Sequence, residues 1–306
     1  MKKIAFLVAA MPLMLAGVLM SCNKSDDGGG SAVEDERLGT ISQKWEIEDA
    51  DSPYASFEFT KAGNYIVVEN GEGDGYEDDW ANYFGAPSKL SKSLFSRAKA
   101  LKAKRAASSN LSPIHFGTYR IDGDKIILSG FGTLEIISLT AEEFAFSFTL
   151  EQSDETSEYH ANRAADAISS SSRTDMLCKT WQWKGLTIDD SGLTAEERQE
   201  LIDEGGSNWK NDFTEMLNEE LRGMSVIISK AGTYLVLYDG DMGEGGLAEW
   251  KWANAAETTF YYSWDNWKYF DEDEDRVEIK ELTDKKLVIK EEFEGLVVLE
   301  ELTAVK

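Results

Sequence analysis

The chain has 306 residues, enough for two ordinary domains, and 42% of them are hydrophobic, which excludes wholesale disorder. Asp and Glu number 57 against 31 Lys and Arg, so the formal net charge is −26. This acidic balance excludes a nucleic-acid partner, because phosphate binding requires clustered basic side chains. The composition therefore predicts well-solvated globular domains whose surfaces repel one another.

The N-terminus has the pattern of a secretory signal. Two lysines precede an apolar run over residues 4–20, and the motif LMSC follows at residues 19–22. This motif resembles the bacterial lipobox, which implies a signal peptide at residues 1–21 and a lipid anchor on Cys22. Two or more acyl chains hold a protein stably on a membrane. The alternative is an uncleaved membrane-spanning helix, but the apolar run is short for that and Cys22 stands where cleavage requires it.

Residues 22–35 are expected to be a lipidated, flexible tether. The acidic motif NKSDD at residues 23–27 resembles the export signal of Bacteroidetes lipoproteins, which implies attachment to the outer membrane facing the cell exterior. Three glycines and a serine follow, a composition typical of flexible linkers. The only other cysteine, Cys178, has no intrachain disulfide partner once Cys22 is acylated, and we interpret it as a small core residue.

One phrase occurs twice in the chain: KAGNYIVVENG at residues 61–71 and KAGTYLVLYDG at residues 230–240. Apolar residues alternate with a period of two on both sides of Gly63 and Gly232, which predicts a β-hairpin with one buried face. A left-handed turn residue suits glycine, because a side chain there is strained. The alternating residues are Phe57, Phe59, Tyr65 and Val67 in the first copy, and Val226, Ile228, Tyr234 and Val236 in the second.

Further landmarks keep the same order in each half, which indicates a duplicated domain. Trp45 and Trp181 open the two copies, and a Leu-Thr pair precedes a late strand in both. We therefore expect one domain over residues 36–165 and another over residues 174–306. Because the spacing between landmarks differs, each copy is expected to carry one insertion at a different place.

The second insertion, about residues 190–223, is predicted to be helical. Thr194 and Glu197 form a capping box, and Gly223 ends the segment. We interpret the apolar stripe as packing against or across a barrel mouth, and not as a cofactor box. The stripe consists of Trp209, Phe213, Met216, Leu217 and Leu221.

The first insertion, about residues 86–108, has the pattern of a basic amphipathic helix. No acidic residue occurs between Asp79 and Asp122. An anionic partner such as lipid headgroups, lipid A phosphates or an acidic glycan would fit this stretch. Docking on the protein's own acidic surface is the other interpretation, and the overall charge favours it. The residues for such a contact are Lys99, Lys102, Lys104 and Arg105.

Each half shows seven or eight short alternating stretches separated by turn signals, which predicts an antiparallel barrel or sandwich. A tryptophan-bearing first strand followed by F-x-F-x-x-x-G-x-Y, here Phe57 to Tyr65 with a degenerate copy at Val226 to Tyr234, resembles the lipocalin-like lipoproteins of Bacteroidetes. The resemblance implies an all-β fold of two tandem antiparallel lipocalin-like β-barrels, each with a helical insertion. The glycine that animal lipocalins set two residues before the tryptophan is replaced here. The internal repeat argues against fimbrillins, which are also two-domain lipoproteins.

Signatures of catalysis are missing from the sequence, so we expect no enzyme, no cofactor and no metal site. His115 and His160 lie outside any metal-ligand spacing, and the sequence has no G-x-S-x-G elbow. The Gly-rich stretch from Asn70 resembles a calcium loop, but Ala81 occupies the position that needs a bidentate acid. These turns therefore end the repeated strand instead.

Aromatic residues gather in the second half and give the strongest ligand signal. Trp250, Trp252, Trp264 and Trp267 are the candidate binding residues, and the first two share a strand face by alternation. They would line a cavity, fill a core, or form an outer stacking platform for a sugar. We expect non-catalytic binding of a small apolar or amphiphilic molecule or a glycan. A structural module docking on another envelope protein is the alternative, and no particular protein partner is indicated.

Overall fold

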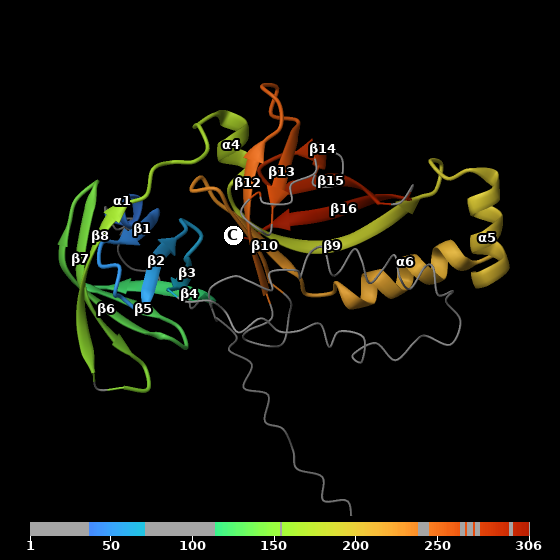
Figure 1. The fold of residues 1–306 in the computed structure, drawn as a ribbon. Helices are drawn as coiled ribbons and strands as arrows, with labels where there is room; N and C mark the ends of the chain where they lie inside the picture. Colours follow the sequence, from blue (N-terminus) through green and yellow to red (C-terminus); the bar gives the residue numbers. More distant parts are fainter. Residues whose placement is uncertain are drawn as a thin grey trace, which may run out of the picture. The chain divides into compact units, whose positions relative to one another are not determined.

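The computed structural model describes residues 37–70, 114–153, 155–237, 245–263, 267, 272, 276–293 and 296–305. The described residues after position 36 belong to one compact unit, Glu36–Lys306. The lipobox, the tether and the basic insertion over residues 86–108 lie outside the described residues, so the predictions made for them stay predictions. The all-β fold class is confirmed, because the described chain forms two closed antiparallel barrels one after the other (Figure 1).

The first barrel consists of eight strands that pair with their neighbours in chain order, and the first pairs with the last to close it. A short helix, α1 (Leu38–Ile41), precedes the first strand. The strands are β1 (Lys44–Ile47), β2 (Tyr54–Phe59), β3 (Asn64–Glu69), β4 (Ile114–Asp122), β5 (Lys125–Leu128), β6 (Gly132–Leu139), β7 (Glu143–Leu150) and β8 (Thr156–Arg163).

The second barrel repeats this order and closes through its own first and last strands. Helix α4 (Ser172–Leu177) precedes it, and α5 (Ala195–Gly205) and α6 (Trp209–Glu220) lie between its first two strands, as the capping box predicted. The strands are β9 (Thr180–Asp189), β10 (Ser225–Ile228), β11 (Thr233–Leu237), β12 (Gly245–Trp252), β13 (Thr259–Ser263), β14 (Arg276–Leu282), β15 (Lys286–Phe293) and β16 (Leu296–Ala304).

The duplicated phrase forms the predicted hairpin in both barrels. Strands β2 and β3 pair with Phe57 opposite Val67, and β10 and β11 pair with Val226 opposite Val236. The turn glycines have φ angles of 81° and 86°, a region that strains any residue with a Cβ. The alternating apolar residues face the two barrel interiors, so the hairpin prediction is confirmed.

The opposite face of the same hairpins carries a second apolar cluster that joins residues of both barrels. Ile66 of β3 packs with Ile227 and Leu235 of β10 and β11, and all three are buried. The Thr233 hydroxyl donates to the Glu58 carboxylate at 2.6 Å beside this cluster. The repeated strands therefore contribute to two cores at once.

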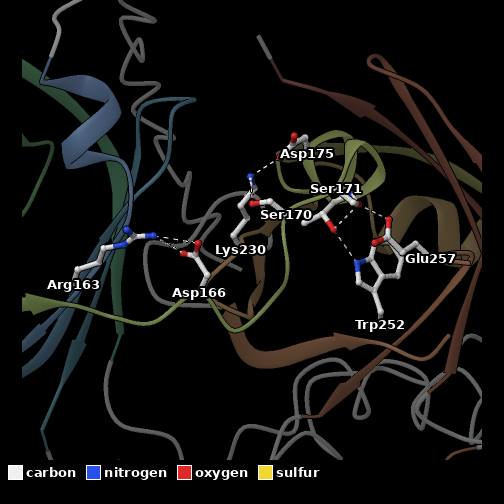
Figure 2. A network of polar contacts seen from close by, with 9 residues as sticks. Arg163, Asp166, Ser170, Ser171, Asp175, Lys230, Trp252 and Glu257 are labelled. Carbon is white, nitrogen blue, oxygen red and sulfur yellow. Dashed lines mark hydrogen bonds and ion pairs between the residues drawn. The ribbon is translucent and has the colours of Figure 1, made fainter. Parts of the chain in front are cut away.

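The segment between the barrels is tied to the tip of the second hairpin (Figure 2). Lys230, from the repeated phrase, pairs with Asp175 of α4 and donates to the Ser170 hydroxyl at 3.3 Å. At the start of the segment, Arg163 pairs with Asp166 at 3.1 Å. The contacts of Lys230 hold α4 and the segment before it against the tip of the second hairpin.

A tryptophan and a short helix close one end of each barrel in the same way. The Trp45 indole N–H donates to the carbonyl of Ile41 in α1 at 3.1 Å, and the Trp181 N–H donates to the carbonyl of Leu177 in α4 at 2.8 Å. Both rings are fully buried. Each indole therefore fills the barrel end and satisfies a carbonyl at the helix C-terminus.

We predict that Trp45→Phe and Trp181→Phe each lower the free energy of unfolding by about 2–4 kcal/mol, because a buried carbonyl loses its donor and the smaller ring leaves a void. Urea denaturation followed by circular dichroism measures this loss. Trp267→Phe is the control, and its expected effect is about 1 kcal/mol or less because this ring is only partly buried on the outer face and its partner Glu249 is exposed. Equal losses in all three variants would contradict the assigned role.

Candidate functional site

The interior wall of the second barrel contains two carboxylates among its apolar residues. Glu291 on β15 follows Leu287 and Ile289 in the inward alternation, and only 8% of it is exposed. Glu300 on β16 is 2% exposed and follows Val298 in the same way. Buried carboxylates are rare in proteins and require polar partners. These two positions are therefore the first candidates for a functional site.

The strand register brings the two carboxylates close together. Glu291 pairs with Val298, and Glu300 pairs with Ile289, so the two glutamates are diagonal neighbours on one face of the β15–β16 ladder. Such diagonal neighbours lie roughly 7–8 Å apart, within reach of long side chains. The two carboxylates therefore lie on the same stretch of the inner wall.

The first barrel has aromatic rings at the corresponding positions. Counted from the threonine turn that precedes β7 in the first barrel and β15 in the second, Phe148 corresponds to Glu291. Tyr159 likewise corresponds to Glu300, because it pairs with Phe146 as Glu300 pairs with Ile289. In the first barrel both rings contact Tyr54, with centroid distances of 5.6 Å for Phe148 and 5.8 Å for Tyr159, and Tyr159 also stacks on Phe146 at 5.6 Å. The two copies thus share a framework but differ in what fills the interior.

A tyrosine two strands away in the same barrel is bonded to one of the carboxylates. The Tyr262 hydroxyl of β13 donates to Glu291 Oε1 at 2.9 Å, and the ring of Tyr262 is stacked on Tyr234 with centroids 5.3 Å apart. Both rings are buried. The bond gives the buried Tyr262 hydroxyl an acceptor and the buried Glu291 carboxylate a donor.

A buried hydrogen-bond donor lies on β9, the strand that pairs with β16. Trp183 of β9 is 5% exposed and faces the interior, and its indole nitrogen has no hydrogen-bond partner among the residues that the structure describes. Strand β9 has one extra residue, Lys184, between Trp183, which pairs with Leu302, and Leu186, which pairs with Glu300. Such bulges re-aim side chains and are common beside functional sites. Trp183 and Glu300 therefore flank the bulge on the inner face.

Helix α6 covers the side of the barrel where β9 no longer pairs with β10. Strand β10 pairs with β9 only as far as Gln182, and beyond it Asn218 of α6 bonds to both backbone groups of Leu186, at 2.9 and 3.2 Å. A Cβ on Gly185 would lie 3.2 Å from the Asn218 amide oxygen, so glycine permits this approach. Figure 1 shows α6 running beside β9. The predicted stripe packs into the barrel core through Trp209, Phe213, Leu217 and Leu221, with Met216 partly buried.

A carboxylate at the end of β9 ties the two insertion helices together. Lys210 of α6 donates to Asp190 at 2.8 Å, and the Arg198 guanidinium of α5 donates to the Asp190 carbonyl at 2.7 Å. The hydrogen bond from Lys210 is the main reason that the pKa of Asp190 lies below its usual value. The helices are thus fixed at the barrel end away from α4.

Trp250 and Trp252 share one strand face, as predicted, at the end of the barrel that α4 closes. The Trp250 N–H donates to the Ser229 carbonyl at 2.8 Å, and the Trp252 N–H donates to the Thr174 hydroxyl of α4 at 3.0 Å. Figure 2 shows Trp252 beside Ser171, which caps α4 and bonds to Glu257. These contacts hold the closed end together.

The other residues predicted for the binding site do not lie beside Trp250 and Trp252 in the part of the chain that the structure describes. Trp267 packs on the outer face of β12, where its N–H donates to Glu249 at 2.6 Å and the Lys251 ammonium lies 3.8 Å from its ring centroid. Trp264, Cys22 and the four basic residues lie outside the described residues. The structure brings Trp250 and Trp252 together and leaves Trp267 on the opposite side of the sheet. It also reveals Trp183, Glu291 and Glu300, which the sequence did not single out.

Cys178 packs against the core of the second barrel and forms no disulfide. Burial raises the pKa of its thiol to about 12. Within the described ranges, no group of His, Cys, Asp and Glu side chains is arranged to hold a metal ion. In the same part of the chain, no helix has the length and apolar character needed to cross a bilayer.

Comparison with known proteins gives no further assignment. No family model matches the chain, and a search of curated proteins found no match. The geometry of the second barrel is therefore the basis for a functional proposal.

We predict that Asn218→Ala lowers the free energy of unfolding by about 2 kcal/mol, because two backbone groups of Leu186 lose their partner. Thermal and urea unfolding measure the change. Asn211→Ala on the same helix is the matched control, since its side chain bonds only to exposed Asn208. A loss in the control as large as in Asn218→Ala would contradict the capping role.

We also predict that Cys178 resists thiol reagents in the folded protein at pH 8, because only the thiolate reacts and a pKa of about 12 leaves very little of it. Labelling with a chromogenic disulfide reagent measures the rate. The same protein in concentrated urea is the control and should react completely. Rapid labelling without denaturant would show that the thiol is accessible and ionised.

Proposed function

We propose that the chain is a non-catalytic surface lipoprotein whose second barrel binds a small amphiphilic molecule. One observation carries this proposal: buried polar groups stand on the inner wall of the second barrel at Trp183, Glu291 and Glu300, amid apolar residues. Burial of polar groups costs stability, and the first barrel uses aromatic rings at the two glutamate positions. A binding role explains why the second copy keeps the polar groups.

The architecture supports this proposal. A closed eight-stranded antiparallel barrel is consistent with a lipocalin-like binding fold, and barrels of this size hold one small ligand or only side chains. Ligand sites are mostly apolar with a few placed polar groups that fix orientation. The interior of the second barrel has this composition, with Tyr262 and the two glutamates on a wall that also contains Ile289 and Val298.

The N-terminal sequence supports a proposed location on the outer membrane. A lipid on Cys22 would anchor the chain to the outer membrane, and the acidic motif after it resembles the export signal of Bacteroidetes surface lipoproteins. The two barrels would then stand off the membrane on the glycine-rich tether. The net charge of −26 fits this setting and opposes binding to nucleic acid.

A specific observation favours the alternative role for the first barrel. Its interior is packed with aromatic pairs, among them Phe57 with Phe146 at 5.2 Å and Trp45 with Phe144 at 5.3 Å. A barrel filled in this way offers its outer surface and its loops for recognition. The first barrel would therefore serve as the interaction module, and Lys99, Lys102, Lys104 and Arg105 would meet an anionic partner or the protein's own acidic surface.

We predict that native mass spectrometry of residues 23–306 detects a co-purified molecule of lipid size, because the proposed site lies inside the barrel. Glu300→Tyr places the first-barrel residue in the second barrel and should abolish the adduct. Glu301→Gln, which alters the adjacent exposed residue on the same strand, is the control. Absence of any adduct, together with no response to lipid and oligosaccharide panels, would leave only the interaction role. Saturable quenching by oligosaccharides alone would move the site to the outer surface near Trp267.

A further inference from the structure

We propose that the face by which the two barrels meet is a docking surface for a second copy of this chain, so that the first barrel of one copy docks on the second barrel of another. Within one chain, the cluster of Ile66, Ile227 and Leu235 joins the barrels through this face. The proposal does not depend on ligand binding inside the second barrel.

Both barrels contribute the same places of the repeated framework to this contact. Ile66 lies opposite Phe116 in the first barrel, and Leu235 lies opposite Leu247 in the second. The residues at equivalent places in and against the cluster are Ile66, Val68 and Phe116 in the first copy, and Leu235, Leu237 and Leu247 in the second. A contact in which two copies use the same patch is the arrangement of a symmetric dimer. The two barrels of one chain therefore meet as two separate copies would.

The central residues of this contact are buried although they lie on the outer side of their strands. Ile66 and Leu235 alternate with Tyr65 and Tyr234, which belong to the interior cores. Separation of the barrels would expose this apolar surface to water, which costs free energy in proportion to its area. A separated barrel therefore needs a cover for this face, and the matching face of another copy supplies one.

Buried polar contacts make the docking specific for unlike barrels. The Thr233 hydroxyl donates to the Glu58 carboxylate at 2.6 Å, and Asn64, at the place of Thr233 in the first copy, accepts from the Thr180 hydroxyl at 2.6 Å. Ile227 occupies the place of Glu58 in the second copy. Two first barrels would bury two Glu58 carboxylates in one interface, and two second barrels would leave the Thr233 hydroxyl without this acceptor. A first barrel therefore selects a second barrel.

The connection between the barrels is short and is held near both barrels. The Ala164 N–H donates to the Lys44 carbonyl at 2.9 Å, and the Ile168 N–H donates to the Lys230 carbonyl at 3.1 Å. A short tether gives an effective concentration in the millimolar range, so docking within one chain prevails in dilute solution. Docking between chains uses the same contacts, and it becomes favourable when docking within the chain is blocked or the protein is concentrated.

The test breaks the two sides of the interface in separate variants of residues 23–306. Ile66→Asp disables the first barrel's face and Leu235→Asp disables the second's, because each places a charge in an apolar contact, so neither variant docks its own barrels. Each barrel keeps its own closed sheet and core, and circular dichroism verifies the fold.

Mixing the two variants at about 100 µM brings one intact first barrel and one intact second barrel together on different chains. Native mass spectrometry and sedimentation velocity should then show a one-to-one complex that neither variant forms alone. Absence of this complex between folded variants would overturn the proposal.

Ile137→Asp is the matched control, because Ile137 is an exposed apolar residue on the outer side of β6 and lies outside the cluster. Its barrels stay docked to each other, so its mixture with Leu235→Asp should give no complex. A complex in this mixture would show that the chains associate through another surface and would contradict the assigned face.

Thr233→Val tests the polar specificity. In the Ile66→Asp chain it leaves Glu58 of the other chain without its donor, and it should weaken the complex at least about tenfold. In the Leu235→Asp chain the same substitution lies on the disabled face and should have no effect. Equal weakening from both chains would overturn the specificity assigned to this pair.

The unaltered chain provides a measurement that needs no variant. Refolding from urea at about 1 mM should yield a dimer, because the protein then matches the effective concentration of the tether, whereas refolding at about 1 µM should yield a monomer. Size-exclusion chromatography with light scattering measures the two species. Monomer alone after refolding at both concentrations would overturn the proposal even if a variant failed to fold.

Discussion

The hydrogen bond from a buried indole to the last turn of a short helix is the contact on which both barrels depend. In the first barrel Trp45 meets Ile41, and in the second Trp181 meets Leu177. Each bond fixes the start of the opening strand, and the strand's alternation then decides which residues face inward. Closing one end with a ring also removes that end from ligand access. Any interior site must therefore lie toward the other end, where in the second barrel the insertion helices pack.

Duplication explains why the two interiors can be compared residue by residue. The framework is the same, and the first barrel has the aromatic rings of Phe148 and Tyr159 where the second has the carboxylates of Glu291 and Glu300. The first interior is filled with rings that contact each other. The second interior has polar groups at two of the corresponding positions. Such local departures from apolar packing are expected at functional sites.

The fold was largely predictable because it depends on local patterns. Alternation around Gly63 and Gly232 gives the hairpins, and the capping box at Thr194 gives the start of α5. The interior site was not predictable in the same way, because Glu291 and Glu300 are two acids among 57 and their burial depends on strand register. The available signal was that each glutamate lies two residues after an inward-facing apolar residue of its own strand. The bulge beside Trp183 and the bonds of Trp250 and Trp252 depend on segments distant in sequence.

The repeated phrase contributes to hydrophobic packing as well as to a turn. Its inward residues build each barrel core, while Ile66 and Leu235, which occupy the same place in the two copies, meet in the cluster between the hairpins. Because the outer and inner faces of these strands are both buried, substitutions there disturb two cores, and the phrase can vary little. Strands β15 and β16 of the second barrel lie outside that cluster. They are therefore free to exchange rings for carboxylates, and a binding site can develop there while the hairpins preserve the fold.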